Sequence, residues 1–462
     1  MLKRFNVKNV YSFAARENGR SEEFSMIAGK VRNKKDHLYD DDKLKLLKFA
    51  AVYGANASGK SNLVKAMELM RSLIVRGLPE GHTEKYCKSD PENRNKPSYF
   101  EIEVVLDNRY YAYGFEIILS QSRFLSEWLV ELFPDGKERE LFTRDIRKAT
   151  FNFDGDLSSK GIKQRLSVYA DDISGNSSVL FLSIMNQNKE NVYSRYPSAV
   201  PLKNVFEWIR DSFSVIYPNQ PISVYDYLSK TEQTQEICKL ISAFGTGITD
   251  FKIVDISLKR VIQDMSQTVR NDVLQKIAEQ QIMIQKNQNI DSINMALRTR
   301  ENFVIITIRR EKGIKCSTIR FSHGDKGSLF ELYEESDGTV RILDLLEILI
   351  AGEGKTYIID ELDRCLHPML SYKFVDTFFR MAEKKRIQLI VTTHESRLMD
   401  FDLLRRDEIW FVDKNATGES SIYSLEEYNT RFDQKVDKAY MDGRYGGVPI
   451  FSTVFPIEEG GA

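Results

Sequence analysis

The segment from Gly54 to Ser61, GANASGKS, has the residue types and spacing needed to hold a phosphate group. Its glycines and small side chains let backbone N–H groups curl around the phosphate, and a following helix directs its positive end there. Lys60 is placed to reach the β and γ oxygens of a nucleoside triphosphate, and Ser61 to offer its hydroxyl to Mg²⁺. The residues predicted to contact ATP are Gly54, Asn56, Ser58, Gly59, Lys60, Ser61 and Asn62.

The elements around this segment decide between a phosphate loop and an ordinary glycine-rich turn. The apolar run 49–53 stops at Gly54, as a buried strand would, and apolar residues recur at helical spacing over 61–75. A strand before the loop and a helix after it are the context that the phosphate-binding motif requires. The sequence therefore favours a nucleotide site.

Two acidic residues, Asp360 and Glu361, follow the apolar run Tyr357–Ile359 far downstream. Asp360 is placed to hold Mg²⁺, directly or through water, and Glu361 to polarise the attacking water. An apolar strand that ends in two acids is common by itself. The pair gains weight because we expect its strand to lie in the same sheet as the strand before Gly54.

Ser336 and Gly338 precede an apolar helix predicted over 339–351, and His394 follows the apolar run 388–391. A helix N-terminus with Ser and Gly can form a second anion site, although a plain capped helix explains the same residues. A histidine at the end of a strand can bond the γ-phosphate or its attacking water, and a histidine bonded only to the backbone is the alternative.

The order of these groups along the chain resembles that of ABC-type ATPases. That resemblance implies an α/β head built from both ends of the chain, and a homodimer or larger homo-oligomer that sandwiches ATP between two copies. Ser336 and Gly338 would then contact the γ-phosphate bound by the other copy. His394 would be the switch histidine, and Leu362-Asp363 the D-loop.

A narrower resemblance is to the overcoming-lysogenisation-defect and SMC-like ATPases, and to the AAA-type ATPases of prokaryotic phage-defence operons. The PARIS ATPase subunit and the Septu and Rlo-type ATPases are examples. The resemblance covers roughly 1–155 and 300–450. The segments that carry it are Lys8–Phe13, Glu335–Thr339, Asp360–Pro368 and Ala439–Pro449.

The chain departs from these families at three points. Tyr11 stands where many relatives carry an arginine near the nucleotide, which leaves the adenine contact unassigned, and Gln121 is the nearest Q-loop candidate by position alone. The relatives that carry a nuclease append a TOPRIM domain, which has a glutamate and a DxD group. The strings 154–156 and 400–402 have the DxD spacing, but each is predicted to cap or turn a loop.

The composition limits the classes of protein to which the chain can belong. The chain has 462 residues, 42% hydrophobic, and a formal net charge of −1, so no global basic field indicates nucleic-acid binding, although a local basic patch stays open. Residues 1–10 lack the apolar core of a signal peptide and no apolar run is long enough to span a bilayer. We expect a cytoplasmic protein without a disulfide framework, because its four cysteines lie far apart: Cys87, Cys238, Cys316 and Cys365.

The pattern along the chain predicts an α/β fold in which both ends form the head. A strand hairpin is expected over 100–117 and a helix over 261–287, the latter as part of either a packed lid or a short coiled-coil arm. The predicted parts are an N-terminal lobe (1–159), a helical insertion (160–300), a C-terminal lobe (301–430) and a tail (431–462).

Three functions remain open. The resemblance favours an ATP-driven sensor and scaffold in a two-component anti-phage system, which would hold a separate effector, a TOPRIM-type nuclease, until a phage protein triggers it. The second is an SMC-like repair or chromosome-associated ATPase that clamps DNA. The third is a nucleotide-dependent interaction module with negligible turnover.

Overall fold

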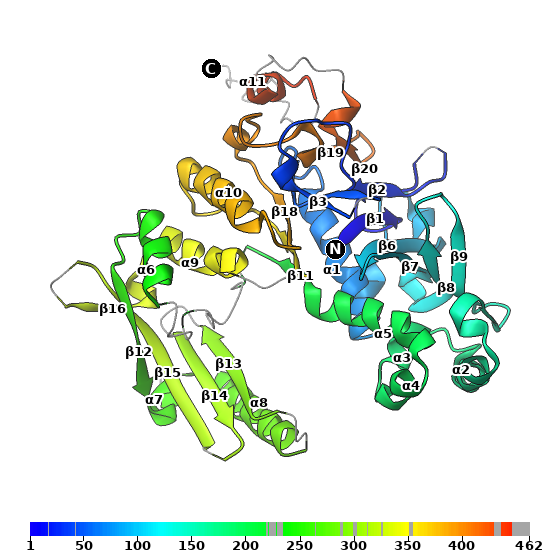
Figure 1. Ribbon diagram of the computed structural model, residues 1–462, viewed down its shortest axis with the longest axis horizontal. Coiled ribbons are helices and arrows are strands. Elements are labelled where there is room, and N and C mark those ends of the chain that lie inside the picture. Colours follow the sequence, from blue (N-terminus) through cyan, green and yellow to red (C-terminus); the bar gives the residue numbers. More distant parts are fainter. Residues whose placement is uncertain are drawn as a thin grey trace, which may run out of the picture. The chain divides into compact units, whose positions relative to one another are not determined.

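The computed structural model divides the chain into two compact units. The first unit consists of 1–218, 352–363 and 375–462, and the second of 219–351 and 364–374. Figure 1 shows the elements of each. The structure describes residues 1–16, 18–41, 43–218, 220, 228, 234–263, 265–286, 290–298, 303–311, 313–324, 327–350, 354–428 and 436–445.

An antiparallel sheet of seven strands forms one layer of the first unit, in the order β10-β9-β8-β7-β6-β1-β2. Asp107 and Asn108 join β6 to β7, and both have positive φ angles, 49° and 59°. Two such residues close a tight turn whose twist matches that of the strands, so the hairpin predicted over 100–117 is confirmed. The strands are β1 (Leu2–Lys8), β2 (Glu22–Ser25), β6 (Ser98–Leu106), β7 (Arg109–Ile118), β8 (Arg123–Leu132), β9 (Glu138–Asp145) and β10 (Thr150–Phe153).

A second sheet, of six strands, joins segments from distant parts of the chain in the order β11-β17-β18-β5-β19-β20. Neighbours from β11 to β19 are parallel, and β20 is antiparallel to β19. The predicted α/β head formed by both ends of the chain is thereby confirmed. The strands are β5 (Phe49–Tyr53), β11 (Phe213–Ile216), β17 (Thr356–Ile359), β18 (Gln388–Thr392), β19 (Ile409–Lys414) and β20 (Ser420–Ser424); β3 (Leu38–Asp40) pairs with β4 (Lys45–Leu47) separately.

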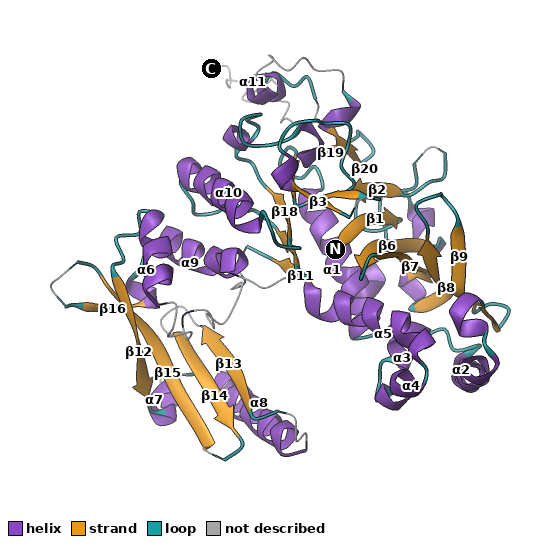
Figure 2. Cartoon of the chain, in the orientation of Figure 1, coloured by secondary structure: helices purple, strands orange, loops and turns teal. Residues whose placement is uncertain are grey.

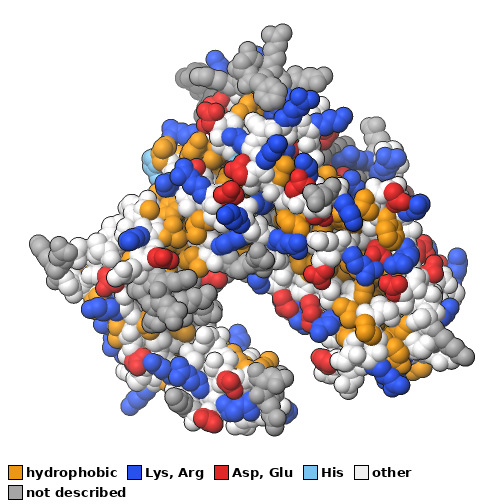
Figure 3. Space-filling view, viewed as in Figure 1, with side chains coloured by type: hydrophobic (Ala, Val, Ile, Leu, Met, Phe, Trp, Pro, Cys, Tyr) orange, Lys and Arg blue, Asp and Glu red, His pale blue; other side chains and the backbone are white. Residues whose placement is uncertain are grey.

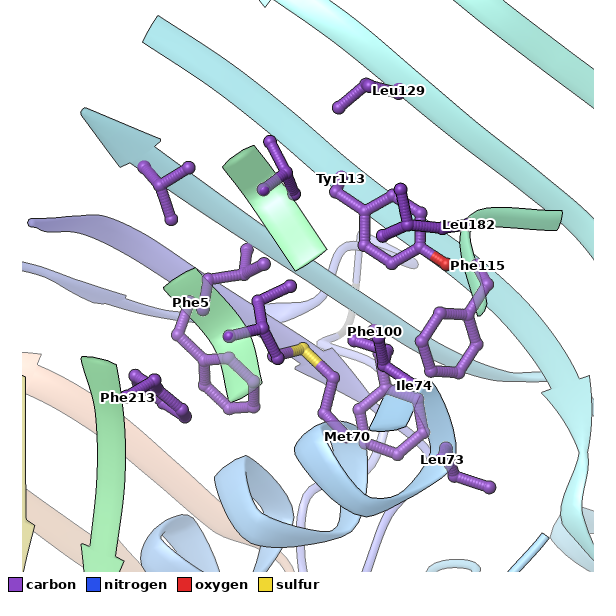
Figure 4. Close-up of a cluster of buried hydrophobic side chains, with 14 of the residues drawn as sticks. Phe5, Met70, Leu73, Ile74, Phe100, Tyr113, Phe115, Leu129, Leu182 and Phe213 are labelled. Carbon is purple, nitrogen blue, oxygen red and sulfur yellow. The ribbon is translucent and has the colours of Figure 1, made fainter. Parts of the chain in front are cut away.

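Helix α1 (Lys60–Val75) contributes to one core with both sheets. Figure 4 shows Met70 and Ile74 of α1 beside Phe100 of β6. Four further helices, purple in Figure 2, follow in the first unit. They pack on the same core through Leu166, Phe181 and Leu202 among others. These are α2 (Lys160–Ile173), α3 (Phe181–Met185), α4 (Glu190–Arg195) and α5 (Val200–Glu207). The core therefore fixes α1, and with it the loop before Lys60.

The second unit contains an antiparallel sheet in the order β12-β15-β14-β13, with β16 paired to β15. Helix α8 packs on this sheet, where Val273 and Ile277 join Val304 and Ile306 in one apolar cluster. The elements are α6 (Thr234–Ala243), β12 (Asp250–Ile256), α7 (Leu258–Gln263), α8 (Gln267–Lys286), β13 (Ser292–Arg298), β14 (Phe303–Arg309), β15 (Gly313–Ser322), β16 (Leu329–Glu331) and α9 (Asp337–Ile350).

The make-up of the insertion differs from the helical insertion predicted over 160–300. Its first part, 160–212, is helical but belongs to the core of the first unit, and its second part includes strands β12 and β13. The helix predicted over 261–287 is divided between α7 and α8, and α8 lies on a sheet. The second of these strands, SINMALR, alternates Ile293, Met295 and Leu297 with polar or small residues. It was nevertheless assigned to the helical insertion, because it follows the Gln-rich segment that was predicted to be a helix.

The C-terminal lobe predicted from 301 also begins later than expected, because β14, β15 and α9 belong to the second unit. After β20 the described chain ends with α11 (Val436–Met441) and a turn to Tyr445. Most of the predicted tail, 431–462, lies outside the described residues. In the described part of the chain no helix combines the length and the apolar character that crossing a membrane requires.

Candidate functional site

A cavity of about 330 Å³ lies between the loop after β5 and the ends of β17 and β18. The described residues that line it all belong to the first unit. They include most of the predicted ATP contacts together with Glu361 and His394, and two lysines that the sequence did not single out, Lys65 and Lys414. The full lining is Asn56, Ala57, Ser58, Gly59, Lys60, Ser61, Asn62, Lys65, Glu361, His394 and Lys414.

The backbone of the loop explains its two glycines. A Cβ at Gly54 would lie 2.3 Å from the carbonyl oxygen of Val412, and a Cβ at Gly59 would lie 2.3 Å from the hydroxyl of Ser420. Gly59 also has a φ of 119°, which L side chains rarely adopt. The loop therefore curls closely against β19 and β20 before α1 begins at Lys60.

Two buried serines from opposite ends of the chain brace this loop. The hydroxyl of Ser420, in β20, lies 2.7 Å from that of Ser12 and 2.6 Å from the carbonyl oxygen of Ser58. The side-chain amide of Asn62 donates to the Ser12 hydroxyl at 2.8 Å. Ser12 falls in the Lys8–Phe13 segment used for the family resemblance, whereas Ser420 has no sequence signal of its own.

Lys60 fits an anion in the cavity. Its ammonium donates to the carbonyl oxygens of Gly54 (2.8 Å) and Ala55 (3.1 Å), both at the mouth of the loop. Burial lowers the pKa of Lys60 to about 8, against an opposing effect of Asp360. Burial deprives the charged ammonium of stabilisation by water, and phosphate oxygens beside it would replace that stabilisation.

The two residues predicted to share Mg²⁺ meet although they are far apart in sequence. The Ser61 hydroxyl donates to Oδ1 of Asp360 at 3.1 Å. A hydroxyl and a carboxylate are oxygen ligands of the kind that Mg²⁺ prefers, usually in company with phosphate oxygens. The donor set therefore fits a magnesium ion bound with a nucleotide.

Glu361 occupies an unusual backbone conformation beside the cavity. Its φ is 53°, in the left-handed region, which costs a non-glycine residue about 1–2 kcal/mol. Its backbone N–H donates to the hydroxyl of Thr392 at 2.8 Å. Strained residues of this kind persist where the surrounding structure holds them, often at functional sites.

His394 lines the cavity from the end of β18. Its backbone N–H donates to Oδ1 of Asp363 at 3.3 Å, and the hydroxyl of Thr393 donates to the same oxygen at 2.6 Å. Burial, together with the positive charge of Lys60, holds the pKa of His394 below its usual 6.5. The imidazole is therefore neutral at pH 7 and keeps a nitrogen that can accept a proton.

The predicted signature residues lie in the second unit. Ser336 is exposed, and its hydroxyl accepts a hydrogen bond from the backbone N–H of Thr339 at 3.1 Å, which caps α9. A Cβ at Gly338 would lie 3.0 Å from the carbonyl oxygen of Cys365, so the chain passes closely there. The hydrogen bond of Ser336 is the one that the capped-helix interpretation predicts.

Gln121, the positional candidate for the Q-loop, lies exposed on a turn between β7 and β8 and does not line the cavity. Tyr11 has a φ of 53° and lies under the ammonium of Lys85, which is 5.8 Å from the centre of its ring. Burial raises the pKa of Tyr11 to about 12. The adenine contact therefore stays unassigned.

The two DxD strings form local turns. The carboxylate of Asp154 accepts a hydrogen bond from the backbone N–H of Gly155 at 2.7 Å, and Asp156 forms ion pairs with Arg109 and Arg139. The carboxylate of Asp400 accepts from the backbone of Asp402 at 2.8 Å. Across the described residues no three His, Cys, Asp or Glu side chains are grouped so that they could hold a metal ion.

Three solved structures to which the chain is similar are heads of SMC proteins. An SMC head bound to the C-terminal winged-helix domain of ScpA is 13% identical with a TM-score of 0.41, and covers 92% of this chain and 99% of its own. The SMC head of Thermotoga maritima (13%, 0.36) covers 92% and 98%. An SMC head with an extended coiled coil, bound to a ScpA domain from Pyrococcus furiosus (14%, 0.32), covers 96% and 99%.

No curated protein matches the chain. A family model described as "AAA domain, putative AbiEii toxin, Type IV TA system" matches residues 49–400, a range that includes the phosphate loop, both acids and His394. The range also includes the whole of the second unit. The chain therefore belongs to this family of AAA-type ATPase domains.

Proposed function

We propose that the chain binds and hydrolyses ATP at the cavity beside Lys60, and that it uses this cycle to control a separate effector in a two-component anti-phage defence system. One observation carries the ATPase part. The hydroxyl of Ser61 meets the carboxylate of Asp360 at 3.1 Å, beside a buried lysine and at the edge of a cavity that Glu361 and His394 also line.

Each residue has a separate task in this proposal. Lys60 and the backbone N–H groups of the phosphate loop bind the β and γ phosphates, while Ser61 and Asp360 hold Mg²⁺. A bound Mg²⁺ would neutralise part of the negative charge on the triphosphate. Glu361 orients the attacking water and accepts its proton, and the neutral His394 bonds the γ-phosphate or that water.

A second copy of the chain completes the site. The motif order of ABC-type ATPases supports this arrangement, and so does the exposure of Ser336 at the start of α9. The backbone N–H groups of a helix start attract an anion, so Ser336 and Gly338 of one copy would contact the γ-phosphate that the other copy binds. The active species is then a homodimer or a larger homo-oligomer.

Output passes through a bound protein. The family description refers to a type IV toxin–antitoxin system, which supports a two-component setting. The resemblance to phage-defence ATPases supports an effector in trans. The side chains of Asp154 and Asp156 are already engaged by a cap and by arginines. The proposed effector is a TOPRIM-type nuclease, and the proposed trigger is a phage protein. ATP can promote release of the effector only if it binds two arrangements of the heads with different affinities.

The surface offers a test of the rival DNA-clamp function. On the face shown in Figure 3, Lys and Arg side chains are interspersed with Asp and Glu. A DNA clamp would need a phosphate-binding surface, and its affinity would fall steeply with salt.

The first experiment measures Mg²⁺-dependent ATP hydrolysis by the purified chain. Wild-type protein should hydrolyse ATP. Asp360→Asn should lose about 100-fold or more in rate, on the scale expected when a charge-stabilising group is removed. Asp154→Asn makes the same chemical change at a surface cap and should keep the wild-type rate. Equal rates for all three proteins would contradict the ATPase proposal.

The second experiment co-expresses the chain with its neighbouring gene product. The partner should co-purify, and its release should depend on ATP. Nucleic-acid cleavage should require the partner. Cleavage by the stringently purified chain alone would contradict the scaffold proposal, and salt-dependent DNA binding by the chain alone would favour the clamp.

A further inference from the structure

Two consecutive threonines at the end of β18 bond to the loop that follows β17. The hydroxyl of Thr392 donates to Oδ1 of Asp360 at 2.6 Å and accepts from the backbone N–H of Glu361 at 2.8 Å. The next hydroxyl, that of Thr393, donates to Asp363 at 2.6 Å. Since β17 and β18 are parallel neighbours, their carboxyl ends meet, and one buried hydroxyl contacts two consecutive acids.

The two bonds of Thr392 restrain different parts of the site. Oδ1 of Asp360 accepts from both Thr392 and Ser61, and two donors on one oxygen restrict rotation of the carboxylate. The other bond gives the N–H of Glu361 an acceptor in its left-handed conformation. Thr392 is 1% exposed and does not line the cavity, so it acts through these neighbours.

We propose that Thr392 is a positioning residue of the ATPase, whose hydroxyl sets the carboxylate of Asp360 for the metal and the backbone of Glu361 for the attacking water. This inference rests on the proposed ATPase function and adds a residue to it. Groups that orient a metal ligand through a hydrogen bond influence metal affinity and activity although they never touch the metal.

The alternative is that the Thr392 hydroxyl only satisfies buried polar groups. The same pair of strands offers a matched control. Thr356, at the beginning of β17, is 0% exposed, and its hydroxyl donates to the side chain of Gln388 at 3.1 Å. Thr356→Val therefore removes a buried hydroxyl from the same sheet at the end away from the acids.

The test compares Thr392→Val, Thr392→Ser and Thr356→Val. Valine keeps the branched shape and removes the hydroxyl, and serine keeps the hydroxyl. For Thr392→Val, kcat should fall, and the Mg²⁺ concentration for half-maximal rate should rise, each by about 10–100-fold. Thr392→Ser and Thr356→Val should stay near wild type in both quantities.

Binding of a fluorescent ATP analogue, titrated with Mg²⁺, gives a readout that needs no turnover. The Mg²⁺ midpoint for binding should rise in Thr392→Val and stay unchanged in the other two variants. Folding is checked by urea unfolding followed by tryptophan fluorescence. If Thr392→Val does not fold, Thr392→Ser and Thr392→Cys carry the same comparison, because a thiol bonds more weakly than a hydroxyl.

Wild-type kcat and Mg²⁺ midpoints in folded Thr392→Val would overturn the inference, as would a serine variant that is as impaired as the valine variant. A wild-type chain that binds Mg²⁺–ATP without hydrolysing it would refute the ATPase proposal, and the binding midpoints would still decide the role of Thr392 in holding Asp360. A wild-type chain that does not bind ATP would contradict both.

Discussion

The hydroxyl of Ser61, in the first turn of α1, donates a hydrogen bond to the carboxylate of Asp360, at the end of β17, over 3.1 Å. The two residues come from separate lobes of the sequence, and β5, β18 and β17 lie side by side in one parallel sheet. In open α/β sheets ligands bind outside the carboxyl ends of the strands. The contact thus lies where such a fold presents a nucleotide site.

Lys60 should make ATP affinity depend on pH. Burial lowers its pKa to about 8 in the nucleotide-free protein, and bound phosphate favours the charged ammonium, so the pKa is higher in the complex. Affinity should therefore fall as pH rises above about 8, by up to about tenfold per pH unit. Fluorescence titrations between pH 7 and 9.5 measure this slope.

Lys60→Arg is the control for that slope, because a guanidinium keeps its charge across this range. Its affinity, whatever its absolute value, should not change with pH through Lys60. A variant that shows the wild-type slope would assign the pH dependence to another group.

The contact between Gly59 and Ser420 should make a methyl group intolerable in the phosphate loop. In Gly59→Ala the added Cβ would lie 2.3 Å from the Ser420 hydroxyl and 2.9 Å from its Cβ. ATP affinity should fall more than in Ser420→Ala, where loss of neutral hydrogen bonds costs on the order of 1 kcal/mol each. Gly77→Ala is the control, since Gly77 also has a positive φ (83°) but no atom within 4 Å of an added Cβ. Equal ATP affinities for Gly59→Ala and Gly77→Ala would contradict the close packing.

Arg405 should be important for stability rather than for the reaction. It is 1% exposed, forms an ion pair with the buried Asp407 at 2.6 Å, and donates to the carbonyl oxygen of Asn33 at 2.7 Å. Arg405→Met leaves a buried carboxylate unpaired, which costs about 3–5 kcal/mol of unfolding free energy. Urea unfolding followed by tryptophan fluorescence reports on the first unit, which contains all three tryptophans.

The exposed pair of Arg380 and Asp376 on α10 (Pro368–Ala382) is the matched comparison. Arg380→Met should change the unfolding free energy by less than about 1 kcal/mol, because exposed ion pairs contribute little. Losses of similar size in Arg380→Met and Arg405→Met would contradict the role given to the buried pair.

If Ser336 of one copy contacts the nucleotide bound by the other copy, two inactive variants should restore ATPase activity when they are mixed. Lys60→Ala and Ser336→Arg chains should each be inactive alone. In their heterodimer one site carries both lesions, and the other combines an intact Lys60 with an intact Ser336. Mixing should therefore restore part of the ATPase activity. No recovery in proven heterodimers would indicate a site completed within one chain.

The sequence predicted those parts of the site that are contiguous or that end apolar strands. The phosphate loop was identified from its own spacing, and Glu361 and His394 from strand ends that a parallel sheet brings together. The meeting of Ser61 and Asp360 was also expected, but contacts made by side chains outside any motif were not foreseen. The hydroxyl of Thr392 donates to Asp360, and the hydroxyl of Ser420 donates to the carbonyl oxygen of Ser58. Neither residue belongs to a spaced motif that the sequence could reveal.

In the fold, too, elements with local sequence signals were predicted and others were not. β6 and β7 were predicted because their alternation and the turn between them are local signals. Strand β12 was not predicted, since its pairing with β15 is a long-range choice. Strand β13 pairs with the next strand along the chain, β14, but it was assigned to the helical insertion because it follows the Gln-rich segment that forms α8. Gln121 was chosen as the Q-loop candidate from its position in the sequence alone, and it lies on an exposed turn that does not line the cavity.

The most direct test of ATP hydrolysis at this site is a single-turnover measurement on Glu361→Gln with ATP and Mg²⁺. The amide keeps the shape of the side chain but cannot accept the proton of the attacking water. The rate of hydrolysis should fall by about 10²–10⁴-fold, the usual contribution of a general base, while ATP affinity stays close to that of the wild type. Hydrolysis by Glu361→Gln at the wild-type rate would contradict the role assigned to Glu361 and the mechanism built on it.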